Sequence, residues 1–389
     1  METIRTRVCV VGGGPAGVML GLLLARDGID VVVLEKHDDF FRDFRGDTVH
    51  PSTLNIIDAL GLRAGFDAID HKPLRQLDVV VDGIRLHAVD FTTLPPPNDS
   101  LTLMPQWDLL DLFADAGRQH PSFGLRMGTD VTDVVRTNGR VTGVVARSRD
   151  GDLRVDADLV VAADGRGSTI RDALRLEPAV NGVPIDVLWF RLPAPEVPMP
   201  DTLAWVTGGT MLVTILRPGY FQCGMIVAKD SFDGIRAAGI EAFRERVAGV
   251  VKLLSVQLNH LPEWWVPGAL LIGDAAHAMS PAFGVGINYA IQDAVAAARI
   301  LVPVLRGDAD PAAIDRACAA LQRRRSGPTL LMQGIQRVVH RAINRRPRRI
   351  LHSPPTRRER RVLRIVLPIA RRLLPRLAGY GFRPERLDF

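Results

Sequence analysis

Cysteine is scarce in this sequence of 389 residues. It contains only Cys9, Cys223 and Cys318, which lie far apart and form no C-x-x-C pair. We therefore expect no disulfide framework. The pattern is typical of a reducing compartment, so we expect a cytoplasmic protein.

A long uninterrupted apolar run is also missing. Residues 8–25 are uncharged and follow Arg5 and Arg7, which is how a secretory signal or a membrane span can begin. Three consecutive glycines and Pro15 interrupt this run, and no small-residue cleavage site follows before Arg26. We expect neither a signal peptide nor a membrane-spanning helix.

Acidic residues are scarce near the C-terminus. From Arg337 onward there are 16 arginines and three acidic residues, so the net charge of +6 comes from this part of the chain. Within residues 345–389, Pro368 and Pro375 are expected to bend or interrupt a helix. Two interpretations stay open: a helix that packs its apolar side on the rest of the protein, or a peripheral contact with an anionic membrane. Interleaved aromatic residues are missing, so we expect no nucleic-acid partner.

The strongest motif is VCVVGGGPAGVMLGLLLARDGIDVVVLE at residues 8–35, which predicts a strand, a tight turn, a helix and a second strand. Gly12, Gly14 and Gly17 fill the glycine positions of G-x-G-x-x-G. They permit the turn, the approach of a pyrophosphate and close packing of helix and strand. Helix N-terminal amides then face the anion, and Glu35 stands where an acidic side chain binds a ribose hydroxyl. The stretch predicts a dinucleotide site but does not distinguish NAD from FAD.

Two later apolar strands end in similar turns. Residues 153–163 lead into Asp164 and Gly165, and residues 269–272 lead into Asp274. In α/β sheets, ligands bind beyond the carboxyl ends of the strands, so we expect these turns to converge. For either aspartate alone, a turn or helix-capping role would be the better interpretation, but their combination with the first motif favours a ligand-binding role.

The rest of the chain divides into expected helices and strands. The expected helices are 52–60 with Ser52 as its N-cap, 106–118, 240–251 and 289–305. The expected strands are 76–89, a hairpin of 131–136 and 141–147 about Asn138-Gly139, and 185–192, 203–206, 211–216 and 220–227. The last four strands are separated by Pro and Gly, which indicates a second domain of antiparallel sheet.

GGGPAG, ADGRGSTIR (163–171) and LIGDAAHAMSPAFGVGINYAIQDA (271–294) stand in the order and approximate spacing of three motifs of one enzyme family. Over residues 8–305 the chain resembles the flavoprotein aromatic hydroxylases of the para-hydroxybenzoate hydroxylase type, which are single-component FAD monooxygenases. The resemblance implies an α/β fold with a Rossmann-like (GR2-type) FAD/NAD(P)-binding domain, an inserted antiparallel-sheet substrate domain and C-terminal helices. The expected boundaries are 1–72, 98–176 and 266–344 for the first domain, 73–97 and 177–265 for the second, and 345–389 for a basic helical tail.

The resemblance also assigns residues to non-covalently bound FAD. The ADP half would be held by Glu35 together with Gly12, Gly14 and Gly17. Arg45 would lie beside the pyrophosphate, and Gln106 would contact the flavin. Asp164 would serve the FAD and NAD(P)H pyrophosphates, and Asp274 the ribityl–pyrophosphate region. The expected cofactor-binding residues are Gly12, Gly14, Pro15, Ala16, Gly17, Glu35, Lys36, Arg45, Gln106, Asp164, Gly165, Asp274, Pro281, Gly284, Gly286, Ile287 and Asn288.

The implied reaction is reduction of FAD by NADPH or NADH, followed by reaction with O2 to a flavin C4a-hydroperoxide. That species would hydroxylate or epoxidise an aromatic, quinone-like or polyketide-like small molecule. Lys36, His37 and Arg42 would meet the 2′-phosphate of NADPH. A reductase or dehydrogenase without productive oxygen transfer, and a flavin-bearing sensor protein, remain alternatives. The W-x-W-x-I-P motif of flavin halogenases is missing. We expect a monomer or a homodimer.

The implied substrate site lies between the antiparallel sheet and the flavin. Candidate substrate residues are Trp189, Arg191, Met211, Tyr220, Gln222, Met225 and Phe283, although many such side chains only pack a core. Candidate catalytic residues are His50, Pro281 and Gly284. Because only three tyrosines exist, a proton relay through tyrosine is disfavoured, and His50 is expected to handle a proton. No metal is required, and His277 is expected to be packed or hydrogen-bonded.

Overall fold

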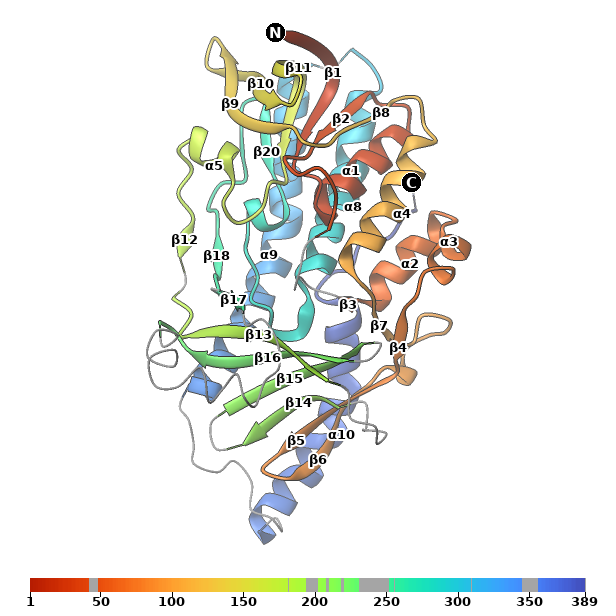
Figure 1. Cartoon of the computed structure of the whole chain (residues 1–389), viewed down its shortest axis with the longest axis vertical. Coiled ribbons are helices and arrows are strands. Elements are labelled where there is room, and N and C mark those ends of the chain that lie inside the picture. The colour runs from red at the N-terminus through yellow and green to blue at the C-terminus, as the bar shows by residue number, and fades with distance from the viewer. Residues whose placement is uncertain are drawn as a thin grey trace.

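The computed structural model describes residues 1–41, 48–180, 182–193, 202–207, 210–217, 220–230, 252–254, 256–308, 310–344 and 356–388. Its largest sheet has eight strands in the order β19-β20-β11-β1-β2-β8, with β10 pairing β11 and β9 pairing β10 (Figure 1). Strands β20, β11, β1, β2 and β8 run parallel. The strands are β1 Glu2–Val11, β2 Val31–Leu34, β8 Phe123–Arg126, β9 Asp130–Thr137, β10 Arg140–Ser148, β11 Gly151–Ala162, β19 Trp265–Val266 and β20 Ala269–Leu271.

Three helices cover one face of this sheet. They are α1 (Pro15–Arg26), α4 (Gln106–Arg118) and α8 (Gly286–Leu305), and α1 packs against both of the others. Ten consecutive residues of α1, 16–25, are buried, because this helix lies between the sheet and its two neighbouring helices. The opposite face carries a second core, in which strands β9–β11 and the fully buried Trp264 pack together.

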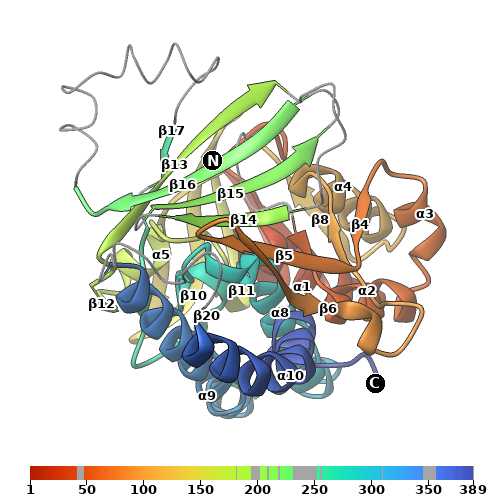
Figure 2. The same cartoon turned by 90° about the horizontal axis from the view of Figure 1, so that it is seen from below.

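A seven-stranded sheet lies beyond the carboxyl ends of the parallel strands (Figures 1 and 2). Its order is β17-β13-β16-β15-β14-β5-β6, and only the β14–β5 pair is parallel. The strands are β5 Gln76–Val81, β6 Ile84–Asp90, β13 Ile185–Pro193, β14 Thr202–Thr207, β15 Thr210–Arg217, β16 Tyr220–Ala228 and β17 Lys252–Leu254. Two distant parts of the chain therefore build one sheet, although the domain boundaries themselves stay a prediction.

Short elements connect the two large sheets. A three-stranded sheet pairs β7 (Leu101–Leu103) with β3 (Thr48–Val49) and β4 (Lys72–Leu74), and β12 (Ala179–Val180) pairs with β18 (Asn259–His260). The remaining short elements are α2 Pro51–Ala59, α3 Arg63–Asp67, α5 Thr169–Ala173, η1 Phe91–Thr93, η2 Gly273–Ala275 and η3 Ala282–Gly284.

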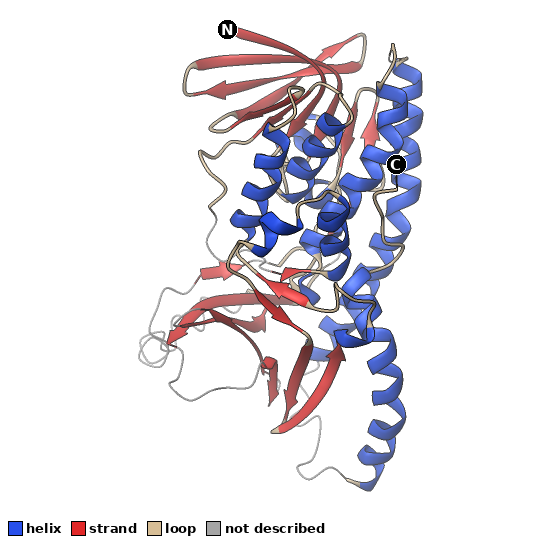
Figure 3. Cartoon of the chain, turned by 90° about the vertical axis from the view of Figure 1, so that its right-hand side faces the viewer, coloured by secondary structure: helices blue, strands red, loops and turns tan. Residues whose placement is uncertain are grey.

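Two long helices lie along one side of the molecule (Figure 3). They are α9 (Pro311–Asn344) and α10 (Arg357–Tyr380). Pro368 and Pro375 were expected to bend or interrupt the last helix, and interruption was wrong, because α10 runs through both residues. A capping box starts it: the Thr356 side chain accepts from the Glu359 amide, and the Glu359 side chain accepts from the Thr356 amide.

Most expected elements are present, but the single strand expected at 76–89 was wrong, because a turn with Asp82 and Gly83 at positive φ divides it into the antiparallel strands β5 and β6. The hairpin is confirmed as β9 and β10, with Asn138 and Gly139 both at positive φ, and the helix 106–118 is confirmed as α4. The predicted N-cap at Ser52 was wrong, because Pro51 occupies the first helical position and places Ser52 inside α2. The predicted helix 240–251 lies outside the described residues.

Candidate functional site

Three turns meet at the carboxyl edge of the eight-stranded sheet. Val11 of β1 stands opposite Ala162 of β11, and Ala162 stands opposite Leu271 of β20. Because these strands are parallel and end in register, their following turns leave the same edge (Figure 1). The turns at residues 12–14, 164–167 and 273–274, which we call the first, second and third turns, therefore form one cradle.

Glycine is required in the first turn and leaves room there. Gly12 has φ +104°, and a Cβ atom at that position would lie 2.5 Å from the carbonyl oxygen of Ala163. A Cβ atom at Gly14 would meet no described atom within 4 Å, although Gly14 immediately precedes α1. This open space beside a helix N-terminus fits the pyrophosphate of FAD, and such a position stabilises each negative charge by about 0.3–1 kcal/mol.

Glu35 lies at the end of β2, beside the first turn, and is nearly buried. Its Oε2 accepts a hydrogen bond of 2.7 Å from the Gly13 amide, and its Oε1 accepts one of 3.0 Å from the His37 amide. These bonds fix a carboxylate where the ribose of FAD would lie. Lys36 is exposed beside it, while Arg42 and Arg45 lie outside the described residues.

Asp164 in the second turn has an unsatisfied buried oxygen. Its Oδ2 accepts from the Ile170 amide at 3.2 Å, whereas its Oδ1 is buried and has no hydrogen-bond partner among the described residues. Burial raises the pKa of Asp164, and hydrogen bonds from Ser168 and Ile170 oppose that shift. A ribose or ribityl hydroxyl is the donor that would satisfy this oxygen.

The third turn connects with the other two. A Cβ atom at Gly273 would lie 3.2 Å from the Cβ atom of Ala16 in α1, so these two backbones approach closely. Arg166 Nε lies 3.8 Å from Asp274 Oδ2. The Arg166 contact is one that the sequence analysis missed, since spacing does not reveal a pairing between residues 108 positions apart.

Residues 281–288 form a loop and the start of α8, at the position predicted for the flavin ring, and we call this segment the flavin loop. Phe283 lies inside η3 at φ +70° and its side chain is 43% exposed, while Pro281 is exposed beside it. A non-glycine residue at positive φ stores backbone strain, which is typical of ligand-binding sites. Gly286 and Ile287 are the first two residues of α8, so their backbone amides lie at the helix N-terminus within this segment.

Asn288 connects the start of α8 to α2. Its Oδ1 accepts hydrogen bonds from the Ser52 hydroxyl at 2.6 Å and the Thr53 hydroxyl at 3.0 Å. Its buried Nδ2 has no partner among the described residues. Ser52 and Thr53 are further residues that the sequence analysis did not assign to the site.

His50 bridges the flavin loop and the C-terminal helix. Its Nε2 lies 3.0 Å from the carbonyl oxygen of Gly284, and its Nδ1 lies 2.5 Å from that of Ala378 in α10. Thr48 also donates to the Gly284 carbonyl at 3.0 Å. Burial lowers the pKa of His50, and the two carbonyl contacts oppose that shift. This geometry favours a positioning role, and proton handling by His50 stays a prediction.

Five of the predicted substrate residues share one face of the seven-stranded sheet. Strand register pairs Arg191 with Gln222, and alternation along the three strands places Trp189, Met211 and Tyr220 on the same side. The Arg191 guanidinium lies 4.8 Å from the centroid of the Tyr220 ring. We call this set, namely Trp189, Arg191, Met211, Tyr220 and Gln222, the sheet face.

Met225 does not belong to the sheet face. It pairs with Leu188 and Leu212 and packs in a cluster with Phe190 and Cys223 on the other side of the sheet. Gly224 pairs with Trp189, and neighbouring residues of a strand point to opposite sides of a sheet, so Met225 points away from the sheet face. Grouping Met225 with the other candidates was therefore wrong.

The sheet face lies on the side of the flavin loop. Trp189 packs in a cluster that includes Leu101 and Leu103 of β7. Strand β7 pairs with β3, whose Thr48 is hydrogen-bonded to Gly284. Gln106 begins α4 three residues after β7, so it also enters this region.

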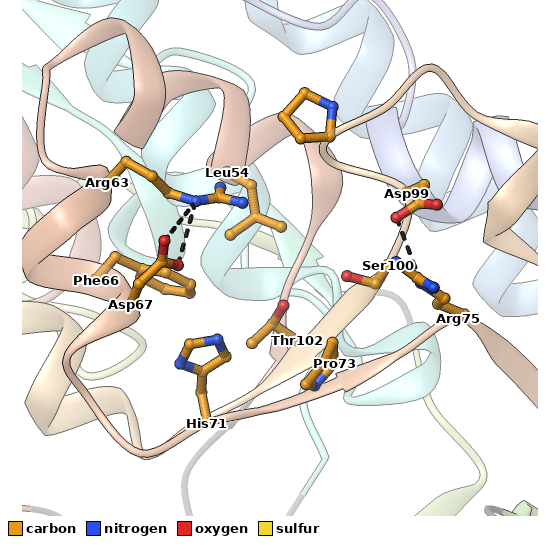
Figure 4. Close-up of a pocket in the computed structure, with 11 residues that line it drawn as sticks. Leu54, Arg63, Phe66, Asp67, His71, Pro73, Arg75, Asp99, Ser100 and Thr102 are labelled. Atoms are coloured by element: carbon orange, nitrogen blue, oxygen red, sulfur yellow. Dashed lines mark hydrogen bonds and ion pairs between the residues drawn. The ribbon is translucent and has the colours of Figure 1, made fainter.

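A separate cavity of about 370 Å³ opens between α2, α3 and β4 (Figure 4). Its wall carries the ion pairs Arg63–Asp67, at 3.2 Å, and Arg75–Asp99, at 3.6 Å. Ligand sites for aromatic compounds are mostly apolar, and no candidate substrate residue lines this cavity. We do not assign the substrate to it.

His277 is hydrogen-bonded in the core, as expected. Its Nε2 lies 2.5 Å from Asp293 Oδ2, and Asp293 Oδ1 accepts from Arg325 Nε at 2.8 Å. All three residues are buried. Burial by itself would raise the pKa of Asp293, but the nearby His277 and Arg325 hold it below its usual range. Asp293 also accepts from the Gly273 amide at 3.1 Å, which connects this buried network to the third turn of the cradle.

The cradle and the fold define a flavin-dependent oxidoreductase, and the comparisons with known proteins agree. A family model described as FAD binding domain matches residues 5–231 and 236–331. The 6-methylpretetramide 4-monooxygenase of Streptomyces rimosus is 34% identical over 330 residues, covering 78% of this chain and 76% of that protein. Protoasukamycin 4-monooxygenase of Streptomyces nodosus subsp. asukaensis is 29% identical over 347 residues, covering 81% and 84% respectively.

Among solved structures, the anhydrotetracycline hydroxylase OxyS from Streptomyces rimosus matches with a TM-score of 0.75. It is 23% identical and covers 97% of this chain and 76% of that chain, a likeness that shows the fold alone. The chain belongs to the FAD binding domain family of flavoprotein monooxygenases. The predicted resemblance, the fold class and the assignment as an FAD-dependent oxidoreductase are thereby confirmed.

The substitution Gly14→Ala is expected to weaken FAD binding while leaving the apoprotein stable. The φ of Gly14, −75°, suits alanine, and the added methyl group would enter the space that the pyrophosphate needs. We expect the Kd for FAD, measured by quenching of flavin fluorescence, to rise at least about tenfold, which corresponds to about 1.4 kcal/mol. Thermal unfolding of the apoprotein should be unchanged.

Gly12→Ala is the matched control for that experiment. Positive φ and the contact with Ala163 should destabilise this variant by about 1–3 kcal/mol even without FAD. Wild-type FAD affinity in Gly14→Ala would contradict the placement of the pyrophosphate.

Proposed function

We propose that this protein uses NAD(P)H and O2 to hydroxylate an aromatic, quinone-like or polyketide-like small molecule. The observation that carries this proposal is the sheet face, which presents aromatic, apolar and cationic groups on the side of the flavin loop. The relatives described above support it, because both are named monooxygenases. Bound FAD supplies the electron transfer and the oxygen activation.

The residues of the chain itself have binding and positioning roles in this proposal. Trp189 and Tyr220 would pack on a flat ring, and Arg191 would bind an anionic oxygen substituent on it. Phe283 would cover the ring from the flavin loop and exclude water from the reacting atoms. His50 would hold the carbonyl of Gly284 in place beneath that loop.

NADPH is the proposed reductant. Lys36 and His37 directly follow Glu35 and are exposed, on the surface that a 2′-phosphate arriving from solvent would meet. The charge of Lys36 favours a phosphate over the hydroxyl of NADH. This assignment depends on the proposed activity.

The exposed side of α10 is proposed to contact an anionic lipid surface. Val362, Ile365, Val366, Ile369 and Leu373 recur at helical spacing and are 51% to 66% exposed. The alternative interpretation, a helix that packs its apolar side on the rest of the protein, does not account for these five exposed side chains. The described part of α10 packs on β6, η1 and α2 at other positions, and its first turns extend beyond the seven-stranded sheet (Figure 3).

Charge favours a lipid surface over a second copy of this chain. Residues 357–376 contain eight arginines and one acidic residue, so two such helices would repel each other. Each basic residue near an anionic bilayer contributes about 1 kcal/mol. No helix among the described residues is long and apolar enough to cross a membrane.

The proposed reaction is tested with FAD-loaded protein and a panel of aromatic and quinone compounds. Binders are selected by the shift that they cause in flavin absorbance and are then assayed for NADPH oxidation. A true substrate should stimulate NADPH oxidation and acquire one oxygen atom from ¹⁸O2, as detected by mass spectrometry. Equal turnover without O2, using a quinone as electron acceptor, would instead support the reductase alternative.

Arg191→Ala is expected to raise the KM for an acidic aromatic substrate at least about tenfold, because a hydrogen bond to a charged group contributes about 1.5–3 kcal/mol. The Kd for FAD should not change. Met225→Ala is the matched control, since Met225 lies on the opposite side of the same sheet and should leave KM unchanged. Equal KM values for wild type and Arg191→Ala would show that the sheet face is not part of the substrate site.

The membrane contact is tested by co-sedimentation with vesicles of phosphatidylcholine alone or with about one-third phosphatidylserine. The wild type should bind only the anionic vesicles, and salt should release it. The double substitution Ile365→Ser and Ile369→Ser should abolish binding. Leu331→Ser with Val338→Ser, on exposed positions of α9, is the control. No binding to anionic vesicles, or dimerisation lost in the first variant alone, would refute the proposal.

A further inference from the structure

The last residues of the chain carry a buried carboxylate. Glu385 is 3% exposed, and its two oxygens accept hydrogen bonds of 2.7 Å each from Arg324 in a bidentate pair. Arg325 and Arg299 also approach this carboxylate, both at 3.8 Å. A carboxylate this deeply buried and paired with three arginines anchors the chain end to α8 and α9.

Arg325 extends this contact to the FAD cradle. Its Nη1 donates to the carbonyl oxygen of Arg383 at 3.3 Å, and its Nε donates to Asp293 at 2.8 Å. Asp293 in turn accepts from the amide of Gly273, the first residue of the third turn. Three buried contacts therefore separate Glu385 from the turn that carries Asp274.

Two further contacts connect the chain end to the flavin loop. The Phe382 amide donates to the Tyr289 hydroxyl at 3.3 Å, and Tyr289 lies in the first turn of α8. The carbonyl of Ala378 contacts His50, whose other ring nitrogen contacts the carbonyl of Gly284. Residues 378–385 thus reach both parts of the site, and Ala378 and Tyr380 also pack in the cluster that contains Trp189.

We propose that residues 378–385 form a C-terminal clamp that holds the third turn and the flavin loop in their FAD-binding geometry. Glu385 is its central positioning residue and does not itself touch the cofactor. This inference depends on FAD binding, which the family establishes, and not on the proposed substrate or reaction.

Because the charged residues that the clamp contacts are buried, we expect the clamp to affect the affinity for FAD. Arg325 and Asp293 have no access to water, so each needs its charged partners in place. Without the charge of Glu385, Arg324 no longer holds the chain end in a bidentate pair, so Arg325 loses a counter-charge and the carbonyl acceptor at Arg383, and we expect it to be held less firmly beside Asp293. The Gly273 amide then loses a fixed acceptor, and FAD must order the third turn as it binds.

The test compares Glu385→Gln with Asp388→Asn. Asp388 also pairs with Arg299, but its carboxylate is 62% exposed and it lies beyond the clamp. FAD affinity of each apoprotein is measured by flavin fluorescence quenching, and apoprotein stability by circular dichroism on heating. We expect the Kd for FAD to rise at least about tenfold in Glu385→Gln and less than about twofold in Asp388→Asn.

A lower unfolding temperature of Glu385→Gln with an unchanged Kd would show a merely structural role and overturn the clamp. An equal loss of affinity in Asp388→Asn would overturn it as well. If the apoprotein of Glu385→Gln does not fold, Glu385→Asp retains the charge near Arg324 while shortening the reach to Arg325. That variant should fold and still lose affinity, and wild-type affinity in it would refute the proposal.

Discussion

The parallel register of β20, β11 and β1 is the constraint on which the rest of the structure depends. Because Val11, Ala162 and Leu271 stand side by side, the turns that follow them converge at one edge. Strand β1 is close to the N-terminus and β20 is more than 250 residues later, so the cradle exists only when the sheet is complete. Loss of pairing at any of these strands would separate groups that bind one cofactor.

A network of buried charged residues supports the cradle from inside the protein. Asp293 contacts His277, Arg325 and the Gly273 amide while it is fully buried. Removing one member of such a network typically costs about 3–5 kcal/mol, because a charge is left without a partner in a low-dielectric interior. The network ties the long helices α8 and α9 to the cradle. The same network extends to Glu385, so the chain end contributes to the interior although it lies last in the sequence.

The two sides of the proposed reaction centre have different physical origins. The cofactor side is backbone, made of tight turns and helix N-termini, and it depends on glycine where φ is positive or space is needed. The substrate side is made of side chains on a sheet, where alternation decides which residues point inward. This difference explains why residues for the cofactor could be assigned with more detail than residues for the substrate.

The sequence by itself determined the local features. Glycine spacing, apolar periodicity and the Asn138-Gly139 turn predicted a dinucleotide site, the β9–β10 hairpin and the helices α4 and α8, because these depend on neighbours in the chain. The FAD family was predicted from the resemblance of three motifs to a known family. The sequence did not reveal that Met225 faces away from Arg191, that α10 continues through its prolines, or that Arg166 and Glu385 find distant partners. Those features depend on strand register, packing and pairs of charges far apart in the chain, which only the tertiary structure brings together.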